Sequence, residues 1–113
     1  PNEIAAGIRA ICHTLRGLMP ETRILLLAIF PRGRTAGDWR RGINEATNSM
    51  VAELDDGEWI HYLDIGSSFL EPDGDLPESM MPDFLHPNER GYQVWAEAME
   101  PTLARLMGDT PVQ

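Results

Sequence analysis

The sequence of 113 residues contains no lysine, a single cysteine and no long apolar run. One cysteine excludes an internal disulfide and a cysteine-based zinc cluster, and we expect Cys12 to be a small apolar group on a helix. The longest apolar run, Ile24–Phe30, is far shorter than the ~20 residues that cross a membrane. With 42% apolar and 24% charged residues, we expect a soluble globular protein. No signal peptide is visible, and the compartment, either cytoplasmic or secreted, stays open.

Positive charge is also scarce. The nine basic residues are all arginine and face 18 acidic residues, which gives a formal net charge of −9. Binding to the phosphates of nucleic acid requires clustered cations. We therefore expect no nucleic-acid partner.

Hydrophobic spacing predicts three helices and two strands. Apolar residues recur at helical spacing from Ile4 to Leu18, with Asn2 as the expected N-cap and Pro20 ending the run. The same pattern predicts helices over Trp39–Leu54 and from Pro87 or Asn88 onward, the last one containing Pro101, which should kink it or remove a hydrogen bond. The near-continuous apolar run Arg23–Phe30 is typical of a strand covered on both faces, and Trp59–Ile65 is predicted to be a second strand.

The order helix–strand–helix–strand–helix predicts a parallel sheet with helices on both faces, a three-layer α/β/α sandwich. Two strands offer little surface for three amphipathic helices and leave apolar edges unpaired. We therefore expect residues 1–113 to be one part of a larger domain.

The segment "DFLH" holds the residues with the clearest chemical potential. A histidine can accept and return a proton near neutral pH, and a carboxylate bonded to its Nδ1 proton fixes its tautomer. Asp83 and His86 lie three positions apart in a loop after the second strand, at the end of the sheet where open α/β folds place their sites. Such a pair also arises by chance, as a helix-capping Asp beside a surface His.

The wider segment "MPDFLHPNERGYQVWAEAMEPTL" resembles the last conserved block of the SGNH (GDSL) hydrolase superfamily, in which Asp-x-x-His precedes a helix. "IRAICHTLRGLMPETRILLLAIFPRG", "NEATN" and "YLDIGSSFLEPDGDL" follow the order of the C-terminal half of that superfamily, most closely of esterases like the catalytic subunits of platelet-activating factor acetylhydrolase. The resemblance implies a flavodoxin-like fold and a serine esterase acting on small acyl esters, acetyl above all. His86 would be the general base and Asp83 its orienting acid.

The same resemblance implies a serine nucleophile and Gly and Asn oxyanion donors from blocks that this chain lacks. Ser67 and Ser68 lack the glycine pattern of a nucleophile turn, and "GDT" at 108–110 matches a nucleophile motif in spelling only. We therefore expect the chain alone to be inactive and to require the complementary N-terminal half as a second chain. The alternative is a non-catalytic interaction or dimerisation module that retains Asp-x-x-His. The partner could then be a second copy in a homo-oligomer.

Three further residues are candidates for substrate contact: Arg32, which follows the first strand, and Phe84 and Leu85, which lie between the pair. Arg32 could equally pair with a carboxylate, and the two apolar residues could equally fill the core.

We expect His13 to face solvent, His61 to be packed or paired, and Asp73 and Asp75 to form a turn. No metal site and no cofactor are predicted. The expected substrate is a small-molecule ester, either an acetylated carbohydrate or a phospholipid-like molecule.

Overall fold

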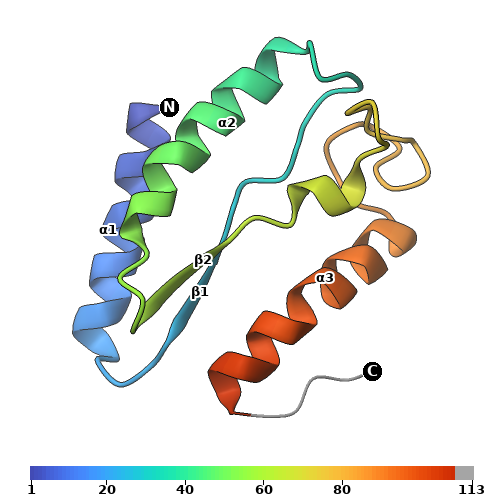
Figure 1. Cartoon of the computed structure of the whole chain (residues 1–113). Helices are drawn as coiled ribbons and strands as arrows, with labels where there is room; N and C mark the ends of the chain where they lie inside the picture. Colours follow the sequence, from blue (N-terminus) through green and yellow to red (C-terminus); the bar gives the residue numbers. More distant parts are fainter. Residues whose placement is uncertain (109–113) are drawn as a thin grey trace.

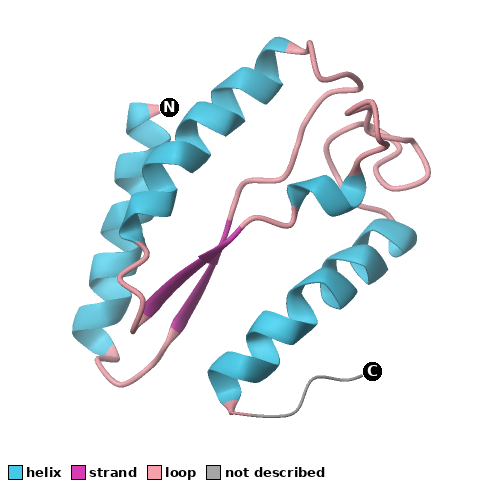
Figure 2. Cartoon of the chain, viewed as in Figure 1, coloured by secondary structure: helices cyan, strands magenta, loops and turns pink. Residues whose placement is uncertain are grey.

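The computed structural model describes residues 1–108 and arranges them in three layers (Figures 1 and 2). Helices α1 (Asn2–Leu18) and α2 (Trp39–Val51) pack together on one side of a sheet formed by β1 (Ile24–Leu27) and β2 (Ile60–Leu63). Helix α3 (Glu89–Met107) lies on the other side. Short 3₁₀ helices follow α2 at Ala52–Leu54 and β2 at Gly66–Phe69. The layered α/β architecture and the element order predicted from the sequence are confirmed.

The two strands pair in parallel, with Ile24 opposite Ile60 and Leu27 opposite Leu63. Both are shorter than predicted. Beyond β1, the amide and carbonyl of Ile29 bond to the side chain of Asn48, so a side chain takes the place of a strand partner. The apolar run therefore continues past the point where the sheet ends.

Helix α1 buries small residues and exposes large ones. Ala5 and Cys12 are buried, as expected for the cysteine, whereas Ile4, Ile11 and Leu18 are 46%, 61% and 74% exposed. The predicted cap is wrong, because Asn2 is already helical and the N-cap position belongs to Pro1, which offers no side-chain hydrogen bond. The exposed residues Ile4, Ile11 and Leu18 thus lack a covering partner within residues 1–108.

The acidic turn before β2 is a hydrogen-bonded structure. One oxygen of Asp56 accepts the backbone N–H groups of Glu58, Trp59 and Ile60 at 2.7–2.9 Å. These bonds, that from Ile60 foremost, lower the pKa of Asp56 to about 2. Asp55 accepts from Gly57 and Tyr62 in the same way. Two exposed carboxylates therefore fix the entry of the chain into β2.

Helix α3 begins at a side-chain N-cap, Asn88. The Asn88 side chain accepts the N–H of Gly91 at 2.9 Å and donates to the carbonyl of Ser79. Pro101 lies inside the helix, as the sequence indicated, and Gly108 ends it with φ 77°. A Cβ on Gly91 would overlap the carbonyl oxygen of Met80 and lie 2.9 Å from Cβ of Pro87. The start of α3 is therefore packed directly on the backbone of the preceding loop.

The main apolar core lies between α3 and the long segment after β2. Its buried residues are Ile65, Phe69, Leu76, Met81 and Val94. Phe30 joins it from the end of β1, with its ring centroid 4.8 Å from those of Phe69 and Trp95. The core thus connects the carboxyl ends of both strands to the first turns of α3.

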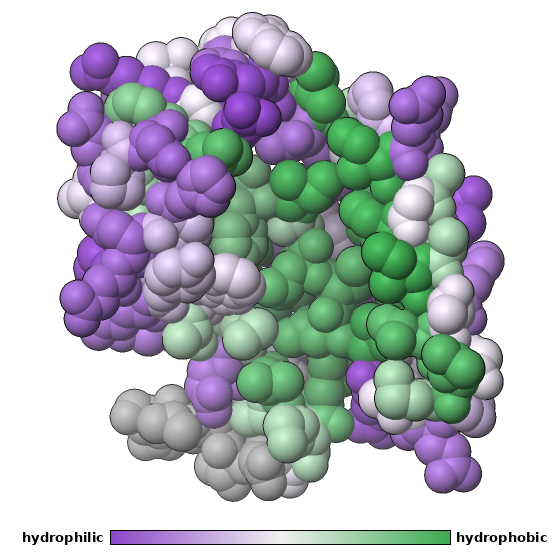
Figure 3. Space-filling view, turned by 180° about the vertical axis from the view of Figure 1, so that it is seen from behind, coloured by the Kyte–Doolittle hydropathy of each residue, from purple (hydrophilic) through white to green (hydrophobic). Residues whose placement is uncertain are grey.

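A wide band of hydrophobic residues is exposed on the face seen in Figure 3. The molecule measures 39 × 38 × 19 Å, and its radius of gyration of 15.0 Å exceeds the ~13 Å typical of a compact domain of about this length. Among residues 1–108, β1 pairs with β2 alone, which leaves its other edge open.

In the described part of the chain, none of the helices has the length and apolar character needed to cross a bilayer.

Gly91→Ala should lower the free energy of unfolding of the chain by about 1–3 kcal/mol, because the added methyl group has no room beside Met80. Gly7→Ala, in α1, is the matched control. Its Cβ would meet no atom within 4 Å, so this variant should gain about 0.5–1 kcal/mol from helix propensity. Denaturant melts of the two variants check both signs, and equal effects would contradict the close packing of Gly91.

Candidate active site

Asp83 and His86 lie in the loop that connects β2 to α3, and the structure brings their side chains together. Oδ2 of Asp83 is 2.6 Å from Nδ1 of His86. Both side chains are open to solvent, at 54% and 74% exposure. Asp83 is not the cap of α3, because Asn88 holds that position. The pair is therefore an independent acid–histidine unit within one short turn.

The second oxygen of Asp83 holds the backbone of the same turn. Oδ1 accepts the N–H of His86 at 2.7 Å and that of Leu85 at 3.0 Å. The backbone bond from His86, followed by the bond to its ring, lowers the pKa of Asp83 to about 2. The carboxylate is thus ionised at neutral pH, as it must be to stabilise a positively charged imidazole.

The arrangement leaves Nε2 of His86 available for proton transfer. No hydrogen bond to Nε2 and no hydroxyl group bonded to His86 is found among residues 1–108. When the Asp83 carboxylate accepts the Nδ1 proton, Nε2 carries the lone pair and can act as a base. The geometry is therefore suited to general-base chemistry, and no nucleophile is bonded to the pair within residues 1–108.

Phe84 bends the loop between the pair. Among residues 1–108 it is the one non-glycine residue with positive φ, at 58°. A left-handed conformation costs an L-residue about 1–2 kcal/mol, so the surroundings must stabilise it. Its ring packs against the apolar core, and its carbonyl accepts the N–H of Gly33 at 2.9 Å. These contacts tie the loop to the segment that follows β1.

Arg32 and Leu85 line one hollow of about 420 Å³ at the end of β1, together with Leu27, Ala28, Ile29, Phe30, Asn44 and Trp95. Arg32 is exposed and makes no ion pair among the described residues. The sequence suggested all three of Arg32, Phe84 and Leu85 as substrate contacts. The structure places Arg32 and Leu85 on the hollow and Phe84 against the core.

The other residues considered from the sequence lie elsewhere. His13 is exposed, and Nε2 of His61 lies 2.8 Å from the carbonyl of Glu58. Asp73 accepts the N–H of Asp75 in a turn. Ser67 and Ser68 are exposed on a 3₁₀ helix, and "GDT" extends beyond the described residues. Residues 1–108 contain no group of three His, Cys, Asp or Glu side chains placed to hold a metal.

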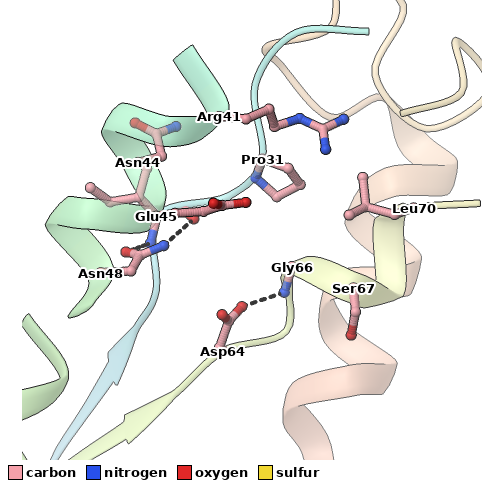
Figure 4. Close-up of a pocket in the computed structure, with 10 residues that line it drawn as sticks. Pro31, Arg41, Asn44, Glu45, Asn48, Asp64, Gly66, Ser67 and Leu70 are labelled. Carbon is pink, nitrogen blue, oxygen red and sulfur yellow. Dashed lines mark hydrogen bonds between the residues drawn. The ribbon is translucent and has the colours of Figure 1, made fainter. Parts of the chain in front are cut away.

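Sequence reasoning missed a polar face of α2. Arg41, Asn44 and Asn48 point from this helix toward the segment after β1 and line a small pocket of about 130 Å³ (Figure 4). Their spacing of three and four positions places them on one side of the helix. That spacing was the available signal, but it could not show which groups these side chains bind.

A sequence model of the GDSL-like Lipase/Acylhydrolase family matches residues 1–94, and the chain belongs to this family. Among its relatives, platelet-activating factor acetylhydrolase IB subunit alpha1 of Rattus norvegicus is 29% identical over 105 residues, which are 93% of this chain and 45% of the relative. Subunit alpha2 of the same organism is 28% identical over 109 residues, covering 96% of this chain and 48% of the relative.

A solved structure from Streptococcus pneumonia, provisionally described as a platelet activating factor, shares the fold with a TM-score of 0.76. It is 22% identical, and the match covers 90% of this chain and 51% of that one. The chain thus spans about half the length of the relatives it matches. The family and fold predicted from the sequence are confirmed.

Asp83 should stabilise the fold above pH ~4 and lose this effect as the pH falls toward 2. Its pKa drops from an ordinary 3.8 to about 2 on folding, so protonation in acid favours the unfolded chain. The stability difference between wild type and Asp83→Asn should therefore be present at pH 6 and shrink between about pH 4 and pH 2. Urea melts over this range measure it, and a difference independent of pH would contradict the hydrogen bonding described.

Proposed function

We propose that this chain provides the acid–base half of a serine esterase. The observation that carries the proposal is the 2.6 Å contact between Asp83 and His86 at the carboxyl end of a parallel sheet. Membership of the GDSL-like Lipase/Acylhydrolase family supports it. A nucleophilic serine and the oxyanion donors would come from a complementary N-terminal half of the domain.

In the proposed reaction, Nε2 of His86 removes the proton of the serine hydroxyl as the oxygen attacks the ester carbonyl. The ring then returns this proton to the leaving alcohol, which yields an acyl-enzyme. In the second stage His86 takes a proton from water, the water attacks the acyl group, and the serine recovers its proton. Asp83 keeps the ring in one tautomer throughout and stabilises the imidazolium. No metal or cofactor enters this scheme.

The open surfaces support a complementary half as the partner. The free edge of β1 can accept a further parallel strand, and the uncovered stripe of Ile4, Ile11 and Leu18 on α1 can pack against the sheet so extended. The matched relatives are roughly twice as long as this chain, so each has enough additional residues for such a half. We propose that this half is present as a second polypeptide or as a preceding part of the same protein.

For the substrate we propose a small-acyl ester, most simply an acetyl ester. The support is the description of the relatives as acetylhydrolases. The alcohol part would be a carbohydrate or a phospholipid-like molecule. The hollow beside Leu85, with its apolar wall and the Arg32 guanidinium at its edge, is a suitable place for part of such a substrate.

The test is to co-express the chain with the N-terminal half of a family relative and to treat the complex with a fluorophosphonate. Intact mass should show one phosphonyl adduct on the partner chain, and the complex should hydrolyse p-nitrophenyl acetate. His86→Ala should lower kcat by at least about 10²–10⁴-fold, because proton transfer at the serine is lost.

His13→Ala is the matched control, since this histidine is exposed on α1, away from the pair, and its loss should leave kcat unchanged. A stable complex that neither hydrolyses the ester nor takes up the phosphonate would exclude the esterase. The alternative, a non-catalytic interaction or dimerisation module, would then be favoured by the same exposed β1 edge and α1 stripe.

A further inference from the structure

Side chains of helix α2 form hydrogen bonds with the backbone of the segment after β1. Asn48 acts as a substitute strand residue, because its side-chain oxygen accepts the N–H of Ile29 at 2.8 Å and its amide donates to the Ile29 carbonyl at 3.0 Å (Figure 4). One turn earlier, the Asn44 amide donates to the carbonyl of Phe30 at 3.2 Å. All three bonds involve backbone groups of the segment. They therefore fix its position without depending on its side chains.

Arg41 continues the same face of the helix. Its side chain is buried, with the residue only 5% exposed, and it donates to three carbonyls: Nε to Arg32 at 3.0 Å, Nη2 to Gly33 at 3.1 Å and Nη1 to Gly74 at 2.9 Å. The guanidinium therefore crosses between two loops that lie 41 residues apart, counting from Gly33 to Gly74. We call Arg41, Asn44 and Asn48 the α2 clamp.

The held segment in turn holds the loop of the acid–histidine pair. Gly33 donates its N–H to the carbonyl of Phe84, the left-handed residue between Asp83 and His86. Gly33 itself has φ 87°, and a Cβ there would overlap the carboxyl group of Asp38, which caps α2. The clamp, Gly33 and Phe84 thus form a continuous path from α2 to the pair.

The loop also contains bonds of its own. The Asp83 carboxylate binds the backbone of Leu85 and His86, so the acid could orient the histidine without help. Those bonds fix the two side chains relative to each other. They do not fix the pair relative to the sheet, whose ends carry the rest of a site. The hydrogen bond from the Gly33 amide to the Phe84 carbonyl links this turn to the segment that follows β1.

We propose that Arg41, supported by Asn44 and Asn48, is a positioning residue for the reaction. It holds the segment 29–33 so that the Gly33 amide anchors Phe84 and directs His86 toward a nucleophile supplied from the other side of β1. This inference rests on the proposed function, since it assigns to the clamp the placement of the His86 base. Arg41 itself touches neither Asp83 nor His86 by any hydrogen bond among residues 1–108.

The test compares Arg41→Gln with Arg40→Gln. Both remove one positive charge at adjacent positions of α2, but the side chain of Arg40 pairs with Asp38 and donates to no loop carbonyl among residues 1–108. The structural readout is the through-hydrogen-bond NMR coupling between the Gly33 amide nitrogen and the Phe84 carbonyl carbon in the isotope-labelled chain. We expect this coupling in wild type and Arg40→Gln and its loss in Arg41→Gln.

The kinetic readout is kcat and KM for p-nitrophenyl acetate in the complex with the complementary half. Arg41→Gln should lower kcat by about 10–100-fold with little change in KM, the effect of a misplaced catalytic group. A retained coupling would overturn the proposal, because the loop would then hold itself. A lost coupling with kcat equal to that of Arg40→Gln would overturn it as well.

Asn44→Ala keeps the proposal testable if Arg41→Gln does not fold. It removes one bond of the clamp and leaves the guanidinium in place, so a weakened coupling and a smaller loss in kcat are expected. An unchanged coupling and unchanged kcat would count against the clamp. If the wild-type complex hydrolyses nothing, the proposed function fails, and the coupling alone still shows whether Arg41 holds the loop.

Discussion

The parallel pairing of β1 with β2 is the interaction on which the site depends. Parallel strands end at the same edge of a sheet, so the segment after β1 and the segment after β2 emerge side by side. This proximity allows the amide of Gly33 to reach the carbonyl of Phe84. A register shift of one residue would turn every side chain of β1 to the opposite face and separate these loops.

Periodicity alone was sufficient to predict the helices and the parallel sheet. The three apolar stripes have helical spacing, and the alternation of helices with short apolar runs leaves few other topologies. The extent of β1 and the cap of α1 could not be predicted in this way. The strand ends where Asn48, nineteen positions away, takes over the bonds of Ile29, and a local pattern carries no information on such a contact.

The candidate site likewise has a part that local sequence could predict and a part that depends on long-range contacts. Asp83 and His86 could be paired from the sequence because they lie three positions apart and stand in a segment that resembles a conserved family block. The hollow shared by Arg32 and Leu85 required the strand order, and Phe84 required its left-handed backbone. Arg41 reads as an ordinary surface residue in the sequence, because its three carbonyl partners become neighbours only on folding.

The open edge of β1 also governs how the molecule behaves toward its own copies. An unpaired strand edge flanked by apolar side chains is a template for pairing with another chain, which leads to aggregation unless something opposes it. Here the opposing force is electrostatic, since every copy carries a formal charge of −9. Salt weakens this repulsion over a Debye length of ~10 Å at 0.1 M, whereas the apolar attraction persists. Colloidal stability of the isolated chain is therefore a property of its ionic surroundings as much as of its fold.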